Sequence, residues 1–179
     1  TCIAELAINQ AVGVLMHGLV ARYGVPRNAD GQAQELIVVG MGKLGGRELN
    51  VSSDIDLIFV YPEDGDTDAA NADQRSISNF EFFTRLGRGL INAIAEVTAG
   101  GQVFRVDMRL RPNGDSGPLV CSFDMLENYF ITQGREWERY AWIKARPLTG
   151  SRHDELEAIR HPFVFRKYLD FGTINAMRE

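Results

Sequence analysis

The stretch that decides the fold covers residues 40–59 and reads GMGKLGGRELNVSSDIDLIF. Its second half predicts a buried strand over residues 54–61, because an apolar run follows and separates the acidic pair Asp54 and Asp56. Side chains two residues apart on a strand share one face, so the two carboxylates project together while the alternate apolar residues enter the core. Neighbouring carboxylates repel each other unless a cation lies between them, and hard oxygen ligands suit Mg²⁺. The pair therefore predicts a magnesium site.

A third carboxylate, Asp107, lies on another predicted strand over residues 103–110. Apolar and charged residues alternate along this run, so Asp107 shares its polar face with Arg105, Arg109 and Arg111. If this strand lies beside the first one, three carboxylates meet and can hold two cations around a transferring phosphoryl or nucleotidyl group. The arginines suit phosphate oxygens, which a guanidinium binds through paired hydrogen bonds. We therefore predict that all three carboxylates are catalytic metal ligands.

The rest of the chain predicts an α+β fold, a small mixed sheet flanked by helices. An apolar run indicates a strand over residues 35–39, before the glycine-rich turn at residues 40–46. Apolar spacing, caps and breakers predict helices over residues 2–23, 78–98, 122–133 and 135–145, and a further helical pattern from residue 151 that breaks near Pro162. We expect a catalytic domain over residues 1–150 and the truncated start of a helical C-terminal segment over residues 151–179.

The two longest predicted helices each carry an apolar stripe that we expect to face the core. In the first, the stripe consists of Ile3, Leu6, Ala7, Val14, Leu15 and Leu19. In the second, it consists of Phe80, Phe83, Gly87, Leu90, Ile94 and Val97. Both stripes follow helical spacings of three and four residues.

Both the acidic pair and the glycine-rich turn also have interpretations without a catalytic role. An Asp-x-Asp pair is common at exposed strand ends, although the apolar neighbours here favour a central strand. The glycine-rich turn could be a plain tight turn, or the dinucleotide-binding pattern G-x-G-x-x-G. The latter needs a crossover helix before the next parallel strand, and residues 46–53 leave room for one helical turn at most. A Walker A loop is excluded, because Lys43 is followed by Leu44 and not by Ser or Thr.

Composition narrows the class of protein. The formal net charge is -5, which argues against a nucleic-acid-binding domain. The two cysteines follow no metal or redox spacing, so we expect a reducing, cytoplasmic location. We expect no membrane association, because the longest apolar stretch, residues 11–21, is too short to cross a bilayer. A first residue other than Met and an end inside a helical pattern suggest a fragment of a longer protein.

Three longer motifs carry a family resemblance. They are residues 40–59, quoted above, RVDMRLRPNGDSGPLV at residues 105–120 and GREWERYAWIKARPL at residues 134–148. A Gly-Lys turn followed by Ser-Asp-Ile-Asp-Leu resembles the polymerase-β-like nucleotidyltransferase superfamily. Together the motifs resemble the bifunctional glutamine synthetase adenylyltransferase and adenylyl-removing enzymes. The resemblance covers the chain from the loop at residues 23–34 to the last helices.

The resemblance implies a reaction and roles for individual residues. Details at residues 48–50, 107–109, 116–119 and 137–140 resemble the N-terminal, adenylyl-removing half of that family. This half removes AMP from a tyrosine of glutamine synthetase by phosphorolysis, with Mg²⁺ as cofactor and ADP as product. Three carboxylates would bind the metal, namely Asp54, Asp56 and Asp107. Six residues would hold nucleotide or phosphate, namely Gly42, Lys43, Gly45, Ser53, Arg109 and Arg111.

The resemblance also implies partners and leaves alternatives open. The expected partners are adenylylated glutamine synthetase, nucleotide, phosphate and the PII nitrogen-signalling protein. The chain could instead be the adenylyl-adding half that uses ATP, or a nucleotide-sensing module without catalysis. Lys144 and Arg146 could contact phosphate or the protein substrate, or they could lie on a solvated face. Trp137, Tyr140 and Trp142 are expected in the core rather than in a base-stacking platform.

Overall fold

A computed structural model describes residues 1–50, 53–97 and 104–165. Its elements in chain order are α1 (Cys2–Tyr23), β1 (Pro26–Arg27), β2 (Ile37–Gly40), α2 (Gly42–Gly45), β3 (Ile55–Tyr61), β4 (Asp66–Thr67), α3 (Asn79–Val97), β5 (Val106–Asp107), the 3-10 turn η2 (Gly114–Ser116), β6 (Val120–Ser122), α4 (Phe123–Thr132), α5 (Glu136–Ile143), β7 (Arg146–Pro147) and α6 (His153–Val164). The predicted α+β class is confirmed, and the fold is that of a nucleotidyltransferase with a small mixed sheet flanked by helices.

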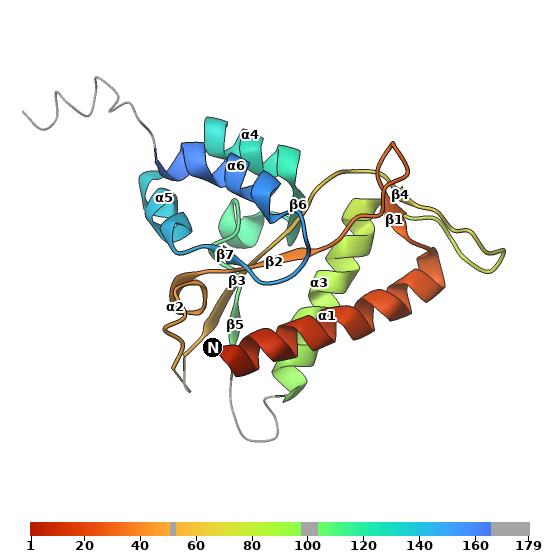
Figure 1. Cartoon of the computed structure of the whole chain (residues 1–179), viewed down its shortest axis with the longest axis horizontal. Coiled ribbons are helices and arrows are strands. Elements are labelled where there is room, and N and C mark those ends of the chain that lie inside the picture. The colour runs from red at the N-terminus through yellow and green to blue at the C-terminus, as the bar shows by residue number, and fades with distance from the viewer. Residues whose placement is uncertain (51–52, 98–103, 166–179) are drawn as a thin grey trace, which may run out of the picture.

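Strand β3 is the centre of the sheet. It pairs antiparallel with β2 and parallel with both β5 and β6, while β2 also pairs with β7. A separate two-stranded ribbon of β1 and β4 lies at the far end of the molecule from α2 and β5 (Figure 1). The antiparallel pairing of β2 with β3 excludes the dinucleotide-binding alternative, which requires parallel strands. Among the described residues between these strands, the only helix is the four-residue α2.

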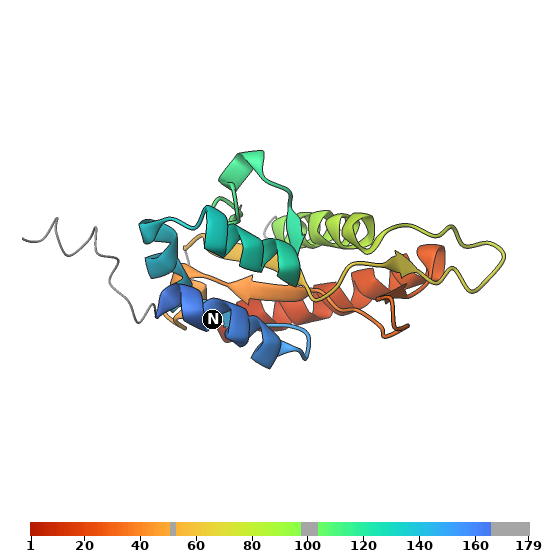
Figure 2. The ribbon, with the colours of Figure 1, turned by 90° about the horizontal axis from the view of Figure 1, so that it is seen from above.

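Alternation along β3 separates two hydrophobic layers. The odd-numbered residues, from Ile55 to Tyr61, pack with α1 and α3, whereas Ile58 and Val60 pack with α4, α5 and α6. The helices accordingly cover opposite faces of the sheet (Figures 1 and 2). Asp56 lies at the start of β3, on the same face of the strand as Ile58. The expectation that the residues beside the acidic pair enter the core is confirmed, because Ile55 and Leu57 are buried.

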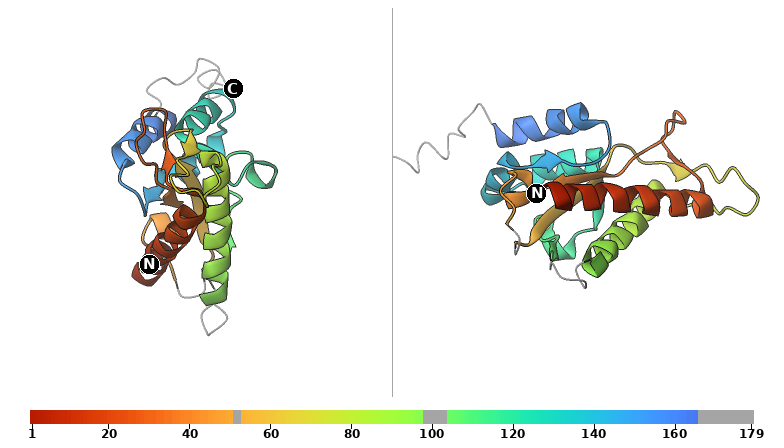
Figure 3. Two further views of the ribbon diagram at one scale, coloured as in Figure 1. Left: turned by 90° about the vertical axis from the view of Figure 1, so that its right-hand side faces the viewer. Right: turned by 60° about the horizontal axis from the view of Figure 1, so that its bottom comes forward.

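Helix α1 spans the predicted residues, and its predicted core stripe is confirmed only at Leu15 and Leu19, which pack against the core. Ile3, Leu6 and Val14 are exposed, whereas Ala4 and Ile8 are buried. Helix α1 crosses α3, as Figure 3 shows from two sides, and over its first turns the side that faces the core is not the predicted one. By length and composition alone, α1 would also suffice to cross a membrane, contrary to the sequence reading. Such a single helix is weak support for membrane insertion, and the expected absence of membrane association stays a prediction.

Helix α3 confirms most of its predicted stripe. Phe83, Leu90 and Ile94 are buried, but Phe80 is partly exposed and Phe82 takes its place in the core. The stripe is wider than predicted because α3 contacts α1 as well as the sheet, so two sides of the helix are covered. Thr98 and the side chain of Val97 lie outside the described residues.

The strand predicted over residues 103–110 is shorter in the structure, where β5 covers only Val106–Asp107. After Met108 the chain turns, because the Arg111 N–H donates to the Met108 carbonyl oxygen at 3.2 Å. The apolar alternation therefore does not continue, and Leu110 packs in the opposite layer from Phe104. Residue 103 lies outside the described residues.

The C-terminal helices form where the sequence predicts them. Ser122 caps α4, since its Oγ accepts a hydrogen bond from the Met125 N–H at 3.2 Å. Helix α6 does not break at Pro162 but continues to Val164. It contributes Leu156 and Phe163 to the layer that α4 and α5 form on the sheet. The division of the chain near residue 150 stays a prediction.

Candidate active site

The register of two strands brings the three predicted carboxylates together. Strand β5 pairs in parallel with β3, and Asp107 lies directly opposite Asp56. The Ile55 N–H donates to the Arg105 carbonyl oxygen at 2.8 Å, which fixes this register next to Asp54. The hollow along this edge has a volume of about 420 Å³, and Asp54, Asp107 and Arg109 contribute to its lining. The sequence-based condition that the two strands lie side by side is therefore met.

Asp56 is the carboxylate under the greatest electrostatic strain. Burial raises its pKa above the ordinary value, and the negative charges of Asp107 and Asp54 raise it further, while Arg109 opposes them. The ionised form of Asp56 is therefore disfavoured at this edge. A divalent cation would relieve this strain, because it lowers the free energy of the ionised carboxylates.

Two arginines occupy the outer carboxylates. Arg105 Nε donates to Asp54 Oδ1 at 3.1 Å, and Arg109 Nε donates to Asp107 Oδ2 at 2.8 Å. In the parts of the chain that are described, no three acidic, His or Cys side chains converge closely enough to hold a metal ion. The oxygen-only donor set still fits Mg²⁺ in kind. The Arg105–Asp54 pair is exposed, so its contribution is about 1 kcal/mol or less and a cation can displace it.

The glycine-rich turn lies against the acidic pair. Gly42 begins α2 with a φ of 52°, and a Cβ atom on it would lie 2.8 Å from Asp56 Oδ2. The Met41 N–H donates to the Asp56 carbonyl oxygen at 2.9 Å, which holds the turn at the start of β3. Lys43 is exposed beside it. Glycine at position 42 therefore allows the backbone to lie directly against the Asp56 carboxylate, where a side chain would collide with it.

Gly45 and Arg146 fix this turn from behind. Gly45 is buried, its N–H donates to the Met41 carbonyl oxygen, and its own carbonyl oxygen accepts from Arg146 Nε at 3.1 Å. Arg146 also forms an ion pair with Glu5 of α1. Lys144 pairs with Glu48 at 3.0 Å. Both basic residues thus hold parts of the structure together, a role that neither sequence-based interpretation described.

Ser53 and Arg111 lie at the edges of this constellation. Ser53 directly precedes Asp54, and its N–H donates to the Asn50 carbonyl oxygen at 3.2 Å. The Arg111 side chain is largely buried and donates to the Met108 carbonyl oxygen at 2.8 Å. Its charge still helps to lower the pKa of Asp107. Their contact with phosphate stays a prediction.

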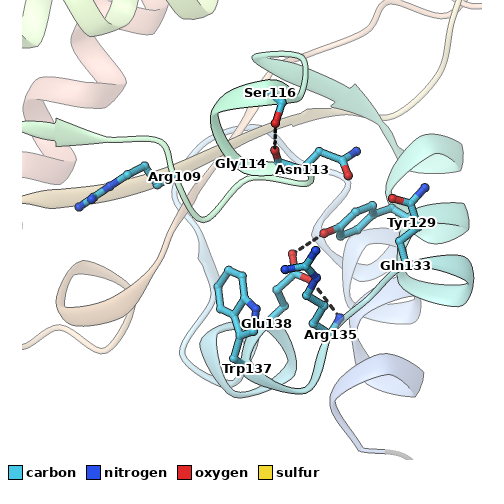
Figure 4. A pocket seen from close by; sticks show the side chains of 9 residues that line it. All are labelled: Arg109, Asn113, Gly114, Ser116, Tyr129, Gln133, Arg135, Trp137 and Glu138. Carbon is cyan, nitrogen blue, oxygen red and sulfur yellow. Dashed lines mark hydrogen bonds between the residues drawn. The ribbon is translucent and has the colours of Figure 1, made fainter.

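A second hollow, which no sequence motif indicated, lies beside the acidic edge and is also lined by Arg109 (Figure 4). Trp137, expected in the core, has 49% of its surface exposed and lines this hollow, and Tyr140 is also exposed. Trp142 is buried, as predicted. Helix α5 is short and covers the sheet with one face only, so its aromatic residues divide between core and surface. The alternation of apolar and charged residues in GREWERYAWIKARPL could have indicated this division.

Two carboxylates at this edge should respond oppositely to pH in the absence of divalent cations. The folded pKa of Asp56 is raised, so its ionisation destabilises the fold as pH rises from the unfolded pKa through the folded one. The folded pKa of Asp107 is lowered, chiefly by its hydrogen bonds with Arg109, so its ionisation stabilises the fold above the unfolded pKa. We expect Asp56→Asn to raise the melting temperature at neutral pH by roughly 2 °C and Asp107→Asn to lower it.

The Asp56 difference should shrink as pH falls toward about 4, because the raised folded pKa and then the unfolded pKa of this carboxyl are passed. The Asp107 difference should shrink only below about pH 4, where the carboxyl is protonated first in the unfolded chain and then in the folded one. Thermal denaturation of the three proteins in a chelator, at several pH values, measures this. Equal destabilisation by both substitutions would contradict the assigned strain at Asp56.

Comparisons with known proteins show which family the chain resembles. A family model described as glutamate-ammonia ligase adenylyltransferase matches residues 1–160. The chain is 73% identical over 178 residues to a bifunctional glutamine synthetase adenylyltransferase/adenylyl-removing enzyme of Aromatoleum aromaticum. The matched region covers 99% of this chain and 19% of that protein. Proteins of the same description from Ralstonia nicotianae and Burkholderia mallei are 60% and 62% identical, each over 99% of this chain and 19% or 20% of their own length. The chain thus spans about a fifth of the length of these relatives.

Proposed function

We propose, because the chain belongs to the glutamate-ammonia ligase adenylyltransferase family, that it catalyses nucleotidyl transfer at the edge formed by Asp54, Asp56 and Asp107. The observation that carries this proposal is the register of β3 and β5, which places Asp107 opposite Asp56. The close approach of Gly42 to the same carboxylate supports it, since this contact holds the glycine-rich turn beside the carboxylate edge.

The proposed reaction is the removal of AMP from a tyrosine of glutamine synthetase. An oxygen of inorganic phosphate attacks the α-phosphorus, the bond from phosphorus to the tyrosine oxygen breaks, and the tyrosine oxygen takes up a proton. The products are ADP and the unmodified tyrosine. The names of the relatives, which include adenylyl-removing enzyme, support this chemistry for the family. The sequence details at residues 48–50, 107–109, 116–119 and 137–140 favour removal over addition for this chain.

The residues of the chain have distinct parts in this proposal. When bound, Mg²⁺ would be held by the three carboxylates and would neutralise charge on the phosphate oxygens. Arg109, which already forms a two-nitrogen fork on Asp107, is placed to turn toward a phosphate that enters the hollow. Gly42 and Lys43 at the start of α2 would face the nucleotide phosphates. Because the protein supplies charge and position, no side-chain nucleophile is required.

The co-substrate decides between removal and addition. The chain is incubated with adenylylated glutamine synthetase, Mg²⁺ and inorganic phosphate, and ADP release is followed. In parallel, unmodified glutamine synthetase and ATP are supplied, and incorporation of AMP is followed. We expect ADP release that requires both phosphate and Mg²⁺, and no incorporation of AMP.

Incorporation of AMP without phosphate-dependent ADP release would assign the chain to addition. Mg²⁺-dependent nucleotide binding without either reaction would favour a nucleotide-sensing module, provided that a full-length relative is active in the same assay. The expected cytoplasmic location and the PII nitrogen-signalling protein as a partner are part of the same proposal.

A further inference from the structure

The second hollow adjoins the carboxylate edge but does not include the carboxylates. It has a volume of about 540 Å³, within the range of pockets that hold small organic ligands. It lies between the η2 loop, the end of α4 and the first turn of α5 (Figure 4). Its lining consists of Arg109, Asn113, Gly114, Ser116, Tyr129, Gln133, Arg135, Trp137 and Glu138.

A buried carboxylate fixes the wall of this hollow. Glu138 is 3% exposed, and its Oε1 accepts a hydrogen bond from the Tyr129 hydroxyl at 2.6 Å. Its Oε2 accepts from the Arg135 N–H at 2.9 Å, which caps the start of α5. The bond from Tyr129 ties α4 to α5, and the bond from Arg135 fixes the first turn of α5, so the wall exists before any ligand arrives. A charged group is rarely buried to this extent unless its partners hold it in place.

The lining chemistry suits a flat heteroaromatic ring. The indole of Trp137 contributes to the lining of the hollow, and about half of its surface is exposed, so it is available for stacking. Asn113 and Gln133 add side-chain amides, which can both donate to and accept from the edge of a purine. Stacking of a base on an aromatic side chain is favourable for any nucleobase, and the amides supply the selection.

Arg109 connects this hollow with the carboxylate edge. It belongs to the lining of both, and its guanidinium is bonded to Asp107. In Figure 4 its side chain extends away from Trp137, in the direction of β5. If a ligand placed a ring beside Trp137 and a phosphate at the carboxylates, the part that joins the ring to the phosphate would therefore lie next to Arg109. A nucleotide has this shape and this distribution of charge.

We propose that the hollow between η2, α4 and α5 is the nucleoside subsite of the enzyme, where adenine stacks on Trp137 and meets the amides of Asn113 and Gln133. Adenine as the base rests on the proposed function. The sugar-phosphate end of the nucleotide then leads past Arg109 to Asp54, Asp56 and Asp107.

Adenosine is the probe that tests the subsite, because it lacks the phosphates that the carboxylate edge would hold. Calorimetric titration of the chain with adenosine should show saturable binding. Trp137→Ala should weaken that binding about tenfold or more, and Trp137→Phe should restore most of it. Tyr140→Ala is the matched control, since Tyr140 is an exposed aromatic residue of α5 outside the hollow, and it should bind adenosine like the wild type.

The outcomes separate this inference from the proposed reaction. Asp54→Asn should leave adenosine binding unchanged even where it abolishes ADP release. Unchanged adenosine binding in Trp137→Ala, or no binding by the wild-type chain, would overturn the subsite whatever the catalytic assays give. Binding of N-acetyltyrosinamide in place of adenosine, with the same dependence on Trp137, would also overturn it and would assign the hollow to the tyrosine of the protein substrate.

Discussion

Replacing Asp56 with asparagine is expected to lower the rate of adenylyl removal by about 10³-fold or more while leaving the chain at least as stable as the wild type. Asp56 is the half-buried member of the constellation, opposite Asp107 and next to Gly42. An amide keeps its shape but removes the negative charge that would bind the cation. The same charge is disfavoured by burial and by its two acidic neighbours, so its removal relieves repulsion in the absence of metal.

The rate and the stability are measured on the same preparation. ADP release from adenylylated glutamine synthetase gives kcat, and thermal denaturation in a chelator gives the melting temperature. Asp54→Asn should lose activity to a similar extent, because Asp54 directly precedes β3 and projects from the same face as Asp56. Asp73→Asn is the matched control, since Asp73 is an exposed carboxylate outside both hollows. Activity within tenfold of the wild type in Asp56→Asn would remove the metal role from this carboxylate.

Local alternation explains why the carboxylate edge could be predicted from the sequence. The side-chain period of a strand is two, so Asp54 and Asp56 share a face wherever the strand lies. The pairing of β3 with β5 was an assumption at that stage, and the register Asp56↔Asp107 now supplies it. The turn before β3 was also predictable, because residues 46–53 are too few for a crossover helix.

Features that depend on contacts between distant segments could not be predicted in this way. Nothing in the sequence around Ile3 and Leu6 indicates that α1 would turn Ala4 and Ile8 toward the core instead. Likewise, Arg146 was assigned to phosphate or solvent, although it binds the glycine-rich turn and Glu5, which lies 141 residues away in sequence. A pattern specifies which residues are apolar or charged, whereas the choice of partner belongs to the packing of whole elements.

Gly45→Ala is expected to destabilise the chain by about 3 kcal/mol or more, because no space exists for a methyl group. A Cβ atom at this position would lie 2.0 Å from the Lys144 carbonyl oxygen and 2.5 Å from the Gly40 carbonyl oxygen. Both are backbone atoms next to β7 or within β2, so relief would require the sheet edge to move.

Gly13→Ala is the matched control for this substitution, since a Cβ atom on Gly13 of α1 meets nothing within 4 Å. Alanine there should raise the free energy of unfolding by about 0.5–1 kcal/mol, because it reduces the entropy lost on forming the helix. Urea denaturation of the two variants and the wild type measures both effects. If Gly45→Ala were as stable as Gly13→Ala, the turn would not be held against residue 144. Severe destabilisation would mean that the fold itself holds the glycine-rich turn, and with it Gly42, against Asp56 in the absence of any ligand.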